Sequence, residues 1–297
     1  MGDPYHPFKS EKAKEAYLAY YDEHAQRWPI PSDPRLVATS FGDTFVRVGG
    51  PGDATPLVLL PGDSENSLAW IPVIEALSVS HRTYALDHIY DIGRSVYSRA
   101  MRHPDDFVRW LDELFIALEL DDLDLMGHSY GGWQAGLYAL AHPERLRSLV
   151  LLAPASTVLR PRLGLLVRAM LYYFIPARSV AKRYLYWYAP VSVRSGDTRA
   201  LIDAMVDEQQ LARRCFKRRN WVRPTVFTDA DWQGLRVPTL FLVGENEVTY
   251  PARGAVRHLG MVAPHVRTLL SPDADHHLAI CKPRWVIDGV LEFLAEG

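Results

Sequence analysis

A serine in a glycine-rich turn is the clearest candidate for chemistry in this sequence. Ser129 lies within Gly127-His-Ser-Tyr-Gly-Gly132, directly after an apolar run at residues 123–126 and just before a helical pattern that begins at Trp133. On a tight turn from strand to helix, the hydroxyl projects from the carboxyl edge of a sheet, and flanking glycines avoid collisions with the neighbouring strand and helix. The following helix N-terminus stabilises developing negative charge. We predict that Ser129 is a nucleophile rather than a structural turn residue.

A serine hydroxyl is a weak nucleophile unless a base accepts its proton. Asp-Ala-Asp-His276-His277 follows an apolar run at residues 266–270. We predict His276 as the base, because Pro283 starts a terminal helical pattern at residues 285–294 and leaves His276 in the loop facing the sheet edge; His277 is the alternative. No metal is predicted, because no His-x-His or His-Glu-x-x-His pattern accompanies these residues.

A carboxylate is needed to fix the tautomer of the base and to stabilise its imidazolium. Gly244-Glu-Asn-Glu247 directly follows the apolar run at residues 239–243, which is a suitable position at a strand end. Glu247 is the predicted acid, and Glu245 and Asp275 remain alternatives.

The oxyanion formed by attack of a serine needs two convergent N–H donors. We predict the backbone N–H of Tyr130, which follows the nucleophile, and that of Asp63, in the turn Pro61-Gly-Asp-Ser64 after the apolar run at residues 57–60. A carboxylate there would repel the oxyanion, so the Asp63 side chain must point away or be neutralised. The alternative role of Asp63 is that of a turn or helix N-cap residue.

The elements that must position these residues alternate between strand and helix. Helical patterns such as residues 107–118 and 133–140 separate the apolar runs, which implies parallel strands with helices on both faces. A hairpin opens the sheet around Gly42-Asp43, and an amphipathic helix at residues 10–27, behind a possible Ser10 cap, precedes it. The predicted strands are residues 36–41, 44–48, 57–60, 83–86, 123–126, 148–152, 239–243 and 266–270.

One long insertion interrupts this alternation. Residues 154–232 show helical patterning and little strand signal, so we predict a cap on an α/β core formed by residues 1–153 and 233–297. The insertion has 14 basic and 6 acidic residues, a charge of +8, and is rich in aromatic residues. These aromatics are expected either to roof a bulky apolar ligand or to pack the cap onto the core, with the basic residues on a solvated face.

Composition excludes several classes of protein. The 297 residues are 48% apolar and 23% charged, which is typical of a globular protein, and the net charge of −2 provides no field for nucleic acid. The basic run at residues 213–219 lacks a recognition fold around it. Cys215 and Cys281 are predicted to be buried thiols. No apolar stretch predicts a membrane span or a secretory signal, so a cytoplasmic location is expected, and the oligomeric state is left open.

Taken together, these residues resemble an α/β-hydrolase fold serine hydrolase, with a carboxylesterase-like N-terminal helix and Gly-Glu-Asn-Glu-Val string. The resemblance covers almost the whole chain, and its pieces stand in the family's order: Pro61-Gly62, Asp87 with Gly93-x-Ser95, the turn at Ser129, Gly244-x-x-Glu247, and His276 with Pro283 behind it. Two positions depart from the family: proline replaces the usual histidine at position 61, and Glu247 stands where aspartate is commoner. A serine at position 129 argues against haloalkane dehalogenases and epoxide hydrolases, which have aspartate there.

The sequence therefore predicts a serine-dependent carboxylic ester hydrolase that forms an acyl-enzyme with a small or medium, apolar ester and needs no cofactor. Three alternatives remain: a lactone or macrolactone esterase, an aminopeptidase-like amide hydrolase, and a ligand-binding homologue without turnover. An aminopeptidase would need acidic residues in the cap, which has few. An intact set of serine, acid and histidine argues against a non-catalytic homologue.

Overall fold

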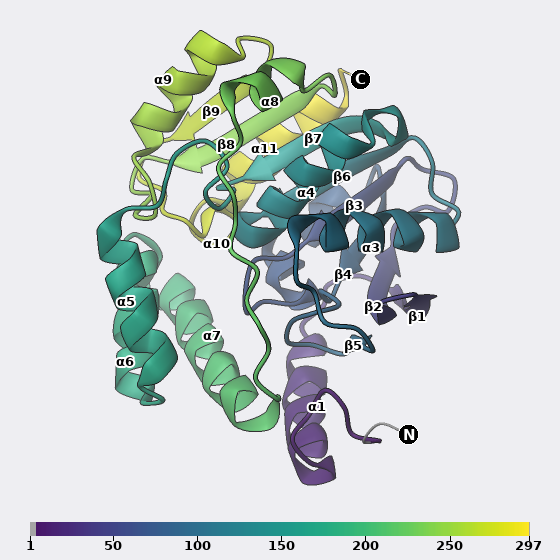
Figure 1. The fold of residues 1–297 in the computed structure, drawn as a ribbon, viewed down its shortest axis with the longest axis vertical. Helices are drawn as coiled ribbons and strands as arrows, with labels where there is room; N and C mark the ends of the chain where they lie inside the picture. The colour runs from purple at the N-terminus through teal and green to yellow at the C-terminus, as the bar shows by residue number, and fades with distance from the viewer. Residues whose placement is uncertain (1–3, 297) are drawn as a thin grey trace.

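A single nine-stranded sheet runs through residues 4–296, the part of the chain that this computed structural model describes (Figure 1). Its strands are β1 (Ser32–Thr39), β2 (Gly42–Gly49), β3 (Pro56–Leu60), β4 (Arg82–Leu86), β5 (Val96–Tyr97), β6 (Leu123–His128), β7 (Leu146–Leu152), β8 (Thr239–Gly244) and β9 (Arg267–Ser271). The order across the sheet is β1-β2-β4-β3-β6-β7-β8-β9, with β5 paired to β2. The pairs of β2 are antiparallel, whereas all pairs from β4 to β9 are parallel. This confirms the predicted α/β class.

Helices cover both faces of the sheet (Figure 1). On one face, α3 (Pro104–Ala117), α4 (Ser129–Ala141) and α9 (Ala252–Val262) share a buried apolar cluster with the strands. On the other face, α2 (Ile71–Leu77), α10 (Leu278–Cys281) and α11 (Pro283–Leu294) form a second cluster. Because both faces are buried, the central parallel strands are almost continuously apolar.

Local chemistry sets the ends of the first elements. Helix α1 (Glu11–Ala25) begins after Ser10, whose hydroxyl accepts the N–H of Ala13 at 3.2 Å, so Ser10 is the N-cap that the sequence indicated. Tyr17 and Tyr21 are the residues of α1 that are buried. Strand β1 begins at Ser32, four residues before the predicted start, and pairs with β2 throughout its length.

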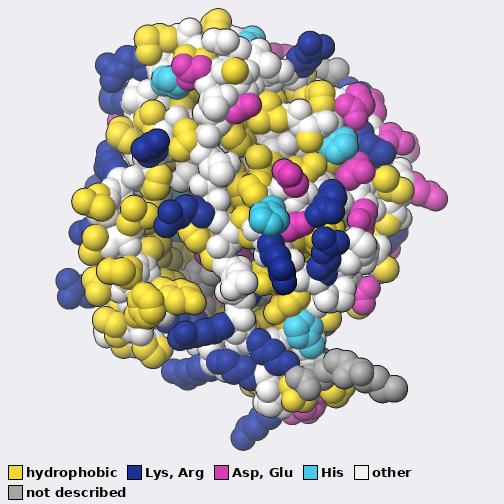
Figure 2. Space-filling model, in the orientation of Figure 1, with side chains coloured by type: hydrophobic (Ala, Val, Ile, Leu, Met, Phe, Trp, Pro, Cys, Tyr) yellow, Lys and Arg dark blue, Asp and Glu magenta, His cyan; other side chains and the backbone are white. Residues whose placement is uncertain are grey.

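The segment between β7 and β8 contains α5 (Leu163–Phe174), α6 (Arg178–Tyr188), α7 (Gly196–Cys215) and the short α8 (Asp229–Gly234). Residues 216–228, within the insertion predicted to run to residue 232, are not helical, and Phe216 forms an isolated bridge with Phe8. Helices α6 and α7 pack around Leu185 and Ile202, whereas α5 has no buried residue. Figure 2 shows hydrophobic side chains gathered over this part of the surface, with Lys and Arg along its border.

Three further expectations concern sites and thiols. Cys215 is buried as predicted, but Cys281 is partly exposed, so its predicted burial is wrong; it ends α10, and its Sγ lies 3.6 Å from Asp275 Oδ1. Among the described residues, none of the helices has the length and apolar character needed to cross a bilayer. Residues 4–296 also contain no cluster of three or more His, Cys, Asp or Glu side chains suited to a metal ion.

Candidate active site

The loops that carry the predicted site residues leave the carboxyl ends of parallel strands. Strand β6 lies between β3 and β7, and β8 lies between β7 and β9. The segments that follow β3, β6, β8 and β9 therefore open at the same edge of the sheet, where α/β proteins place their ligands.

Ser129 occupies a strained turn between β6 and α4. Its φ of +50° lies in the left-handed region, which a non-glycine residue adopts at a cost of about 1–3 kcal/mol. The turn is also tight: a Cβ on Gly127 would lie 2.3 Å from the carbonyl oxygen of Gly131, and a Cβ on Gly131 would lie 2.4 Å from that of Leu60. The glycine spacing in the sequence is thus required by backbone packing, and Ser129 is 8% exposed at the end of the strand.

His276 and Glu247 form a buried hydrogen-bonded pair. The Nδ1–H of His276 donates to Glu247 Oε2 at 2.7 Å, and Glu247 Oε1 accepts the N–H of Thr249 at 2.7 Å. Burial opposes ionisation of Glu247, but the His276 ring and these hydrogen bonds outweigh it and lower the pKa of the carboxyl. With its proton held at Nδ1, a neutral His276 has a lone pair at Nε2 and is suited to accept a proton there.

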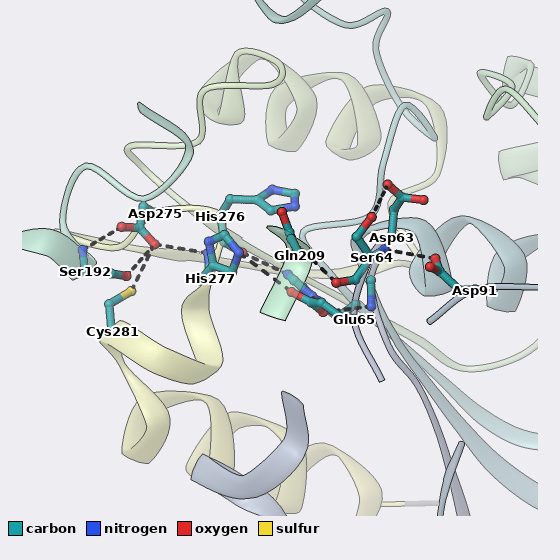
Figure 3. Close-up of polar contacts among 12 residues, drawn as sticks. Asp63, Ser64, Glu65, Asp91, Ser192, Gln209, Asp275, His276, His277 and Cys281 are labelled. Atoms are coloured by element: carbon teal, nitrogen blue, oxygen red, sulfur yellow. Dashed lines mark hydrogen bonds and ion pairs between the residues drawn. The ribbon is translucent and has the colours of Figure 1, made fainter. Parts of the chain in front are cut away.

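The other candidates for the acid and the base have different partners. Glu245 is exposed and pairs with Arg253. Asp275 is fully buried and accepts the N–H groups of Val191 and Ser192 at 2.9 and 2.7 Å, so it joins the loop after β9 to the turn after α6. His277 faces Glu65 instead of Glu247: its Nε2 is 3.7 Å from Glu65 Oε1 (Figure 3), and burial lowers its pKa to about 4.

The structure does not join Ser129 to His276 by a hydrogen bond. Within residues 4–296, neither Ser129 Oγ nor His276 Nε2 has a hydrogen-bond partner. The two residues are connected through His128, whose Nε2 lies 3.1 Å from the carbonyl oxygen of His276 and whose ring centroid is 5.1 Å from the His276 ring. A catalytic hydrogen bond of this kind is often long in the unliganded state, and rotation of the Ser129 side chain breaks no existing hydrogen bond.

The two predicted oxyanion donors lie in separate segments of the chain. Tyr130 is the second residue of α4, so its N–H is among the first four of the helix, which have no partner within the helix. Among the described residues, the N–H of Asp63 has no acceptor, although Gly62 and Ser64 on either side donate to Glu65 and Asp91.

The Asp63 carboxylate is neutralised by Arg219, whose Nη2 lies 3.4 Å from Asp63 Oδ1 and 2.5 Å from Asp91 Oδ1. This resolves the repulsion expected from the sequence. Asn66, and not Asp63, caps the 3-10 turn that follows, because its Oδ1 accepts the N–H of Leu68 at 3.0 Å.

Sequence reasoning did not single out several residues of this site. Tyr188, at the end of α6, packs edge-on against His276 with ring centroids 4.6 Å apart. Tyr188 is one of the aromatic residues for which the insertion stands out in the sequence, but its contact with the base was not predictable, because nearly ninety residues separate the two. Glu65 and His128 also form a buried pair beside the nucleophile. The only sequence feature that pointed to this pair was the position of Glu65 in the loop after β3.

Comparison with known proteins agrees with the fold. The model of the alpha/beta hydrolase fold family matches residues 55–179. Carboxylesterase YbfK of Bacillus subtilis is 32% identical over 280 residues, which is 93% of each chain. Its crystal structure superposes with a TM-score of 0.85, covering 96% of this chain and 99% of that one at 31% identity. Naproxen esterase of Bacillus subtilis has a TM-score of 0.87 at 29% identity, with coverage of 96% and 99%. This chain thus belongs to the carboxylesterases of the α/β-hydrolase fold.

Proposed function

We propose that the protein hydrolyses small or medium, apolar carboxylic esters through an acyl-enzyme on Ser129. The observation that carries this proposal is the buried Glu247–His276 hydrogen bond at the sheet edge where the strained Ser129 turn lies. The membership of the chain in the carboxylesterases supports the same reaction.

In the proposed mechanism, substrate binding brings Ser129 Oγ into hydrogen-bond contact with His276 Nε2. The Oγ attacks the acyl carbon while its proton passes to Nε2, and the carbonyl electron pair becomes an oxyanion held by the N–H groups of Tyr130 and Asp63. The tetrahedral intermediate collapses, and the protonated His276 gives its proton to the leaving alcohol. Water then attacks the acyl-enzyme with His276 as base, which regenerates the Ser129 hydroxyl. Glu247 stabilises the imidazolium in both halves.

We further propose that residues 154–232 form a cap over this site. Three contacts support this role: Tyr188 packs against His276, Arg219 pairs with Asp63, and Asp275 holds the backbone of residues 191–192. Aromatic groups next to the base favour an apolar acyl or alcohol group. The named activity of a relative on naproxen esters agrees with a substrate that has an aromatic group.

The test is hydrolysis of a panel of p-nitrophenyl esters and lactones by the wild-type protein and by Ser129→Ala. Loss of the nucleophile is expected to lower kcat on the order of a million-fold, because the members of a triad act as a unit. A fluorophosphonate probe should label the wild-type protein and leave the variant unlabelled. Ser40→Ala, at an exposed serine bonded to Glu113, is the control and should keep full activity. Near-wild-type hydrolysis by Ser129→Ala would refute the proposal.

A further inference from the structure

Three segments of the candidate active site meet at the carboxylate of Glu65. Glu65 is 7% exposed, and its Oε2 accepts the N–H of Gly62 at 2.9 Å and lies 3.1 Å from His128 Nδ1. Its Oε1 lies 3.7 Å from His277 Nε2 (Figure 3). Each of these three partners is adjacent in sequence to a residue of the proposed machinery: Gly62 to Asp63, His128 to Ser129 and His277 to His276. The mechanism proposed above makes no use of Glu65.

The hydrogen bonds of His128 determine its protonation. Its Nε2 faces the carbonyl oxygen of His276 at 3.1 Å, and its Nδ1 faces the Glu65 carboxylate. A carbonyl and an ionised carboxylate only accept hydrogen bonds, so both ring nitrogens of His128 must donate, and the ring is an imidazolium. Burial opposes ionisation of Glu65, yet the adjacent His128 outweighs it and lowers the pKa of the carboxyl to about 2.

The pairing with Glu65 also changes the pKa of His128. Burial disfavours the imidazolium, but the Glu65 carboxylate more than offsets this and raises the pKa of His128. The other titratable groups that face the ring are His276, His277 and Glu247. Burial keeps His277 neutral, so Glu65 and His128 form the ion pair of this group.

The pair packs directly against the backbone of Gly62. A Cβ on Gly62 would lie 2.7 Å from Glu65 Oε2 and 3.1 Å from His128 Nδ1. The carboxylate and the imidazole therefore fill the space that a side chain at position 62 would need. This contact explains why position 62, next to the predicted oxyanion donor Asp63, is a glycine.

We propose that Glu65 is a positioning residue for the ester hydrolase: through the His128 imidazolium it fixes the backbone of His276, and through its own carboxylate it fixes the loop that carries Asp63. The inference rests on the proposed function. Glu65 itself touches no reacting atom. It acts by holding the base and an oxyanion donor in register with the Ser129 turn, and misplacement of such groups by about 1 Å costs on the order of a hundred-fold in rate.

Glu65→Gln and Glu65→Leu separate this role from simple burial of a side chain. The two contacts meet at Oε2, so the carboxamide can keep its oxygen there to accept both the Gly62 N–H and the Nδ1–H of His128, with its NH2 at the Oε1 position that faces His277. Leucine removes both contacts at similar volume. We expect E65L to lower kcat on p-nitrophenyl butyrate by about 10–100-fold with KM within about threefold, and E65Q to recover kcat to within about fivefold of wild type.

The matched control is Asp124→Asn, at the other end of β6. Asp124 is a buried carboxylate that accepts from the Ser148 hydroxyl at 2.6 Å and lies 3.8 Å from His81 Nε2. It is thus a buried carboxylate near a histidine but far from the site, and D124N should keep kcat within about twofold whatever its effect on stability. A folded E65L with kcat within twofold of wild type would overturn the proposal, as would E65Q falling as far as E65L.

Nitrogen-15 NMR of the histidine rings gives a readout that does not depend on turnover. In the wild-type protein at pH 7 both nitrogens of His128 should be protonated, and in E65Q, which lacks the carboxylate that stabilises the imidazolium, only one of them should be, with His128→Gln used for assignment. A neutral His128 in the wild-type protein would refute the proposal even if E65L does not fold. Retained activity in Ser129→Ala would instead refute the proposed function. The NMR result would still show whether Glu65 and His128 form an ion pair.

Discussion

The hydrogen bond between Glu247 and His276 has two chemical effects on the imidazole. It holds the ring in the tautomer with a lone pair at Nε2, and it stabilises the imidazolium that forms when Ser129 loses its proton. Both effects depend on an acceptor at Glu247 that is ionised and buried. The lowered pKa of this carboxyl ensures that it is ionised at neutral pH.

Glu247→Gln should therefore lower kcat for p-nitrophenyl esters by about 10³–10⁴-fold while the protein stays folded, because the amide favours the wrong tautomer. Glu245→Gln is the control on the same loop. It loses an exposed pair with Arg253 and should change kcat by less than about twofold. Equal losses in the two variants would contradict the assignment of the acid.

Single residues were predictable where a local pattern specifies them. Ser129 stands out because glycines at fixed offsets are needed wherever a strand turns sharply into a helix. The choice between Glu245 and Glu247, and the pairing of Arg219 with Asp63, depend on contacts between segments far apart in the chain. No spacing in the sequence encodes these contacts.

At the scale of elements, the strands could be predicted from short apolar runs because both faces of the parallel sheet are buried. The insertion was harder to predict, since its helices contact the core through a few side chains. Helix α5 is the extreme case: it carries the exposed apolar residues Leu163, Leu166, Val167, Met170, Leu171, Tyr173 and Phe174. An apolar face predicts burial, and the structure of this chain leaves that face uncovered.

A helix without buried residues should open locally far more easily than one in the core. We expect the amides of α5 to exchange with deuterium at least about a hundred-fold faster than those of α4, of which most residues are buried. Hydrogen exchange followed by mass spectrometry at pH 7 measures both helices in one experiment. Equal protection in α5 and α4 would show that α5 is covered in solution.

At the scale of the whole molecule, Glu208 links three parts of the chain. From α7 it accepts the Tyr17 hydroxyl of α1 at 2.9 Å and the Asn66 side chain of the loop after β3 at 2.6 Å. Burial raises its pKa from 4.5 to about 7, although these hydrogen bonds oppose the rise. The folded state therefore keeps a proton on Glu208 at pH values where the unfolded chain has lost it.

This difference predicts a pH dependence of stability. Between pH 4.5 and 7 the folded state binds more protons at Glu208 than the unfolded state, so its contribution to stability falls as the pH rises, by at most about 3 kcal/mol, and is constant above 7. Glu208→Gln imitates the protonated acid and should gain stability relative to wild type between pH 5 and pH 8. Urea unfolding of both proteins at the two pH values tests this, and a pH-independent difference would contradict it.

Asp275 ties the loop that bears the proposed base to residues 191–192 of the insertion through hydrogen bonds to both backbone N–H groups, and its carboxylate is fully buried. A hinge motion that lifted this end of the insertion would pull on the neighbouring His276. We therefore expect substitutions at Val191 or Ser192 that disturb these bonds to shift the imidazole as well. Helix α5 is not tied to the base in this way, so we expect changes there to leave the imidazole in place.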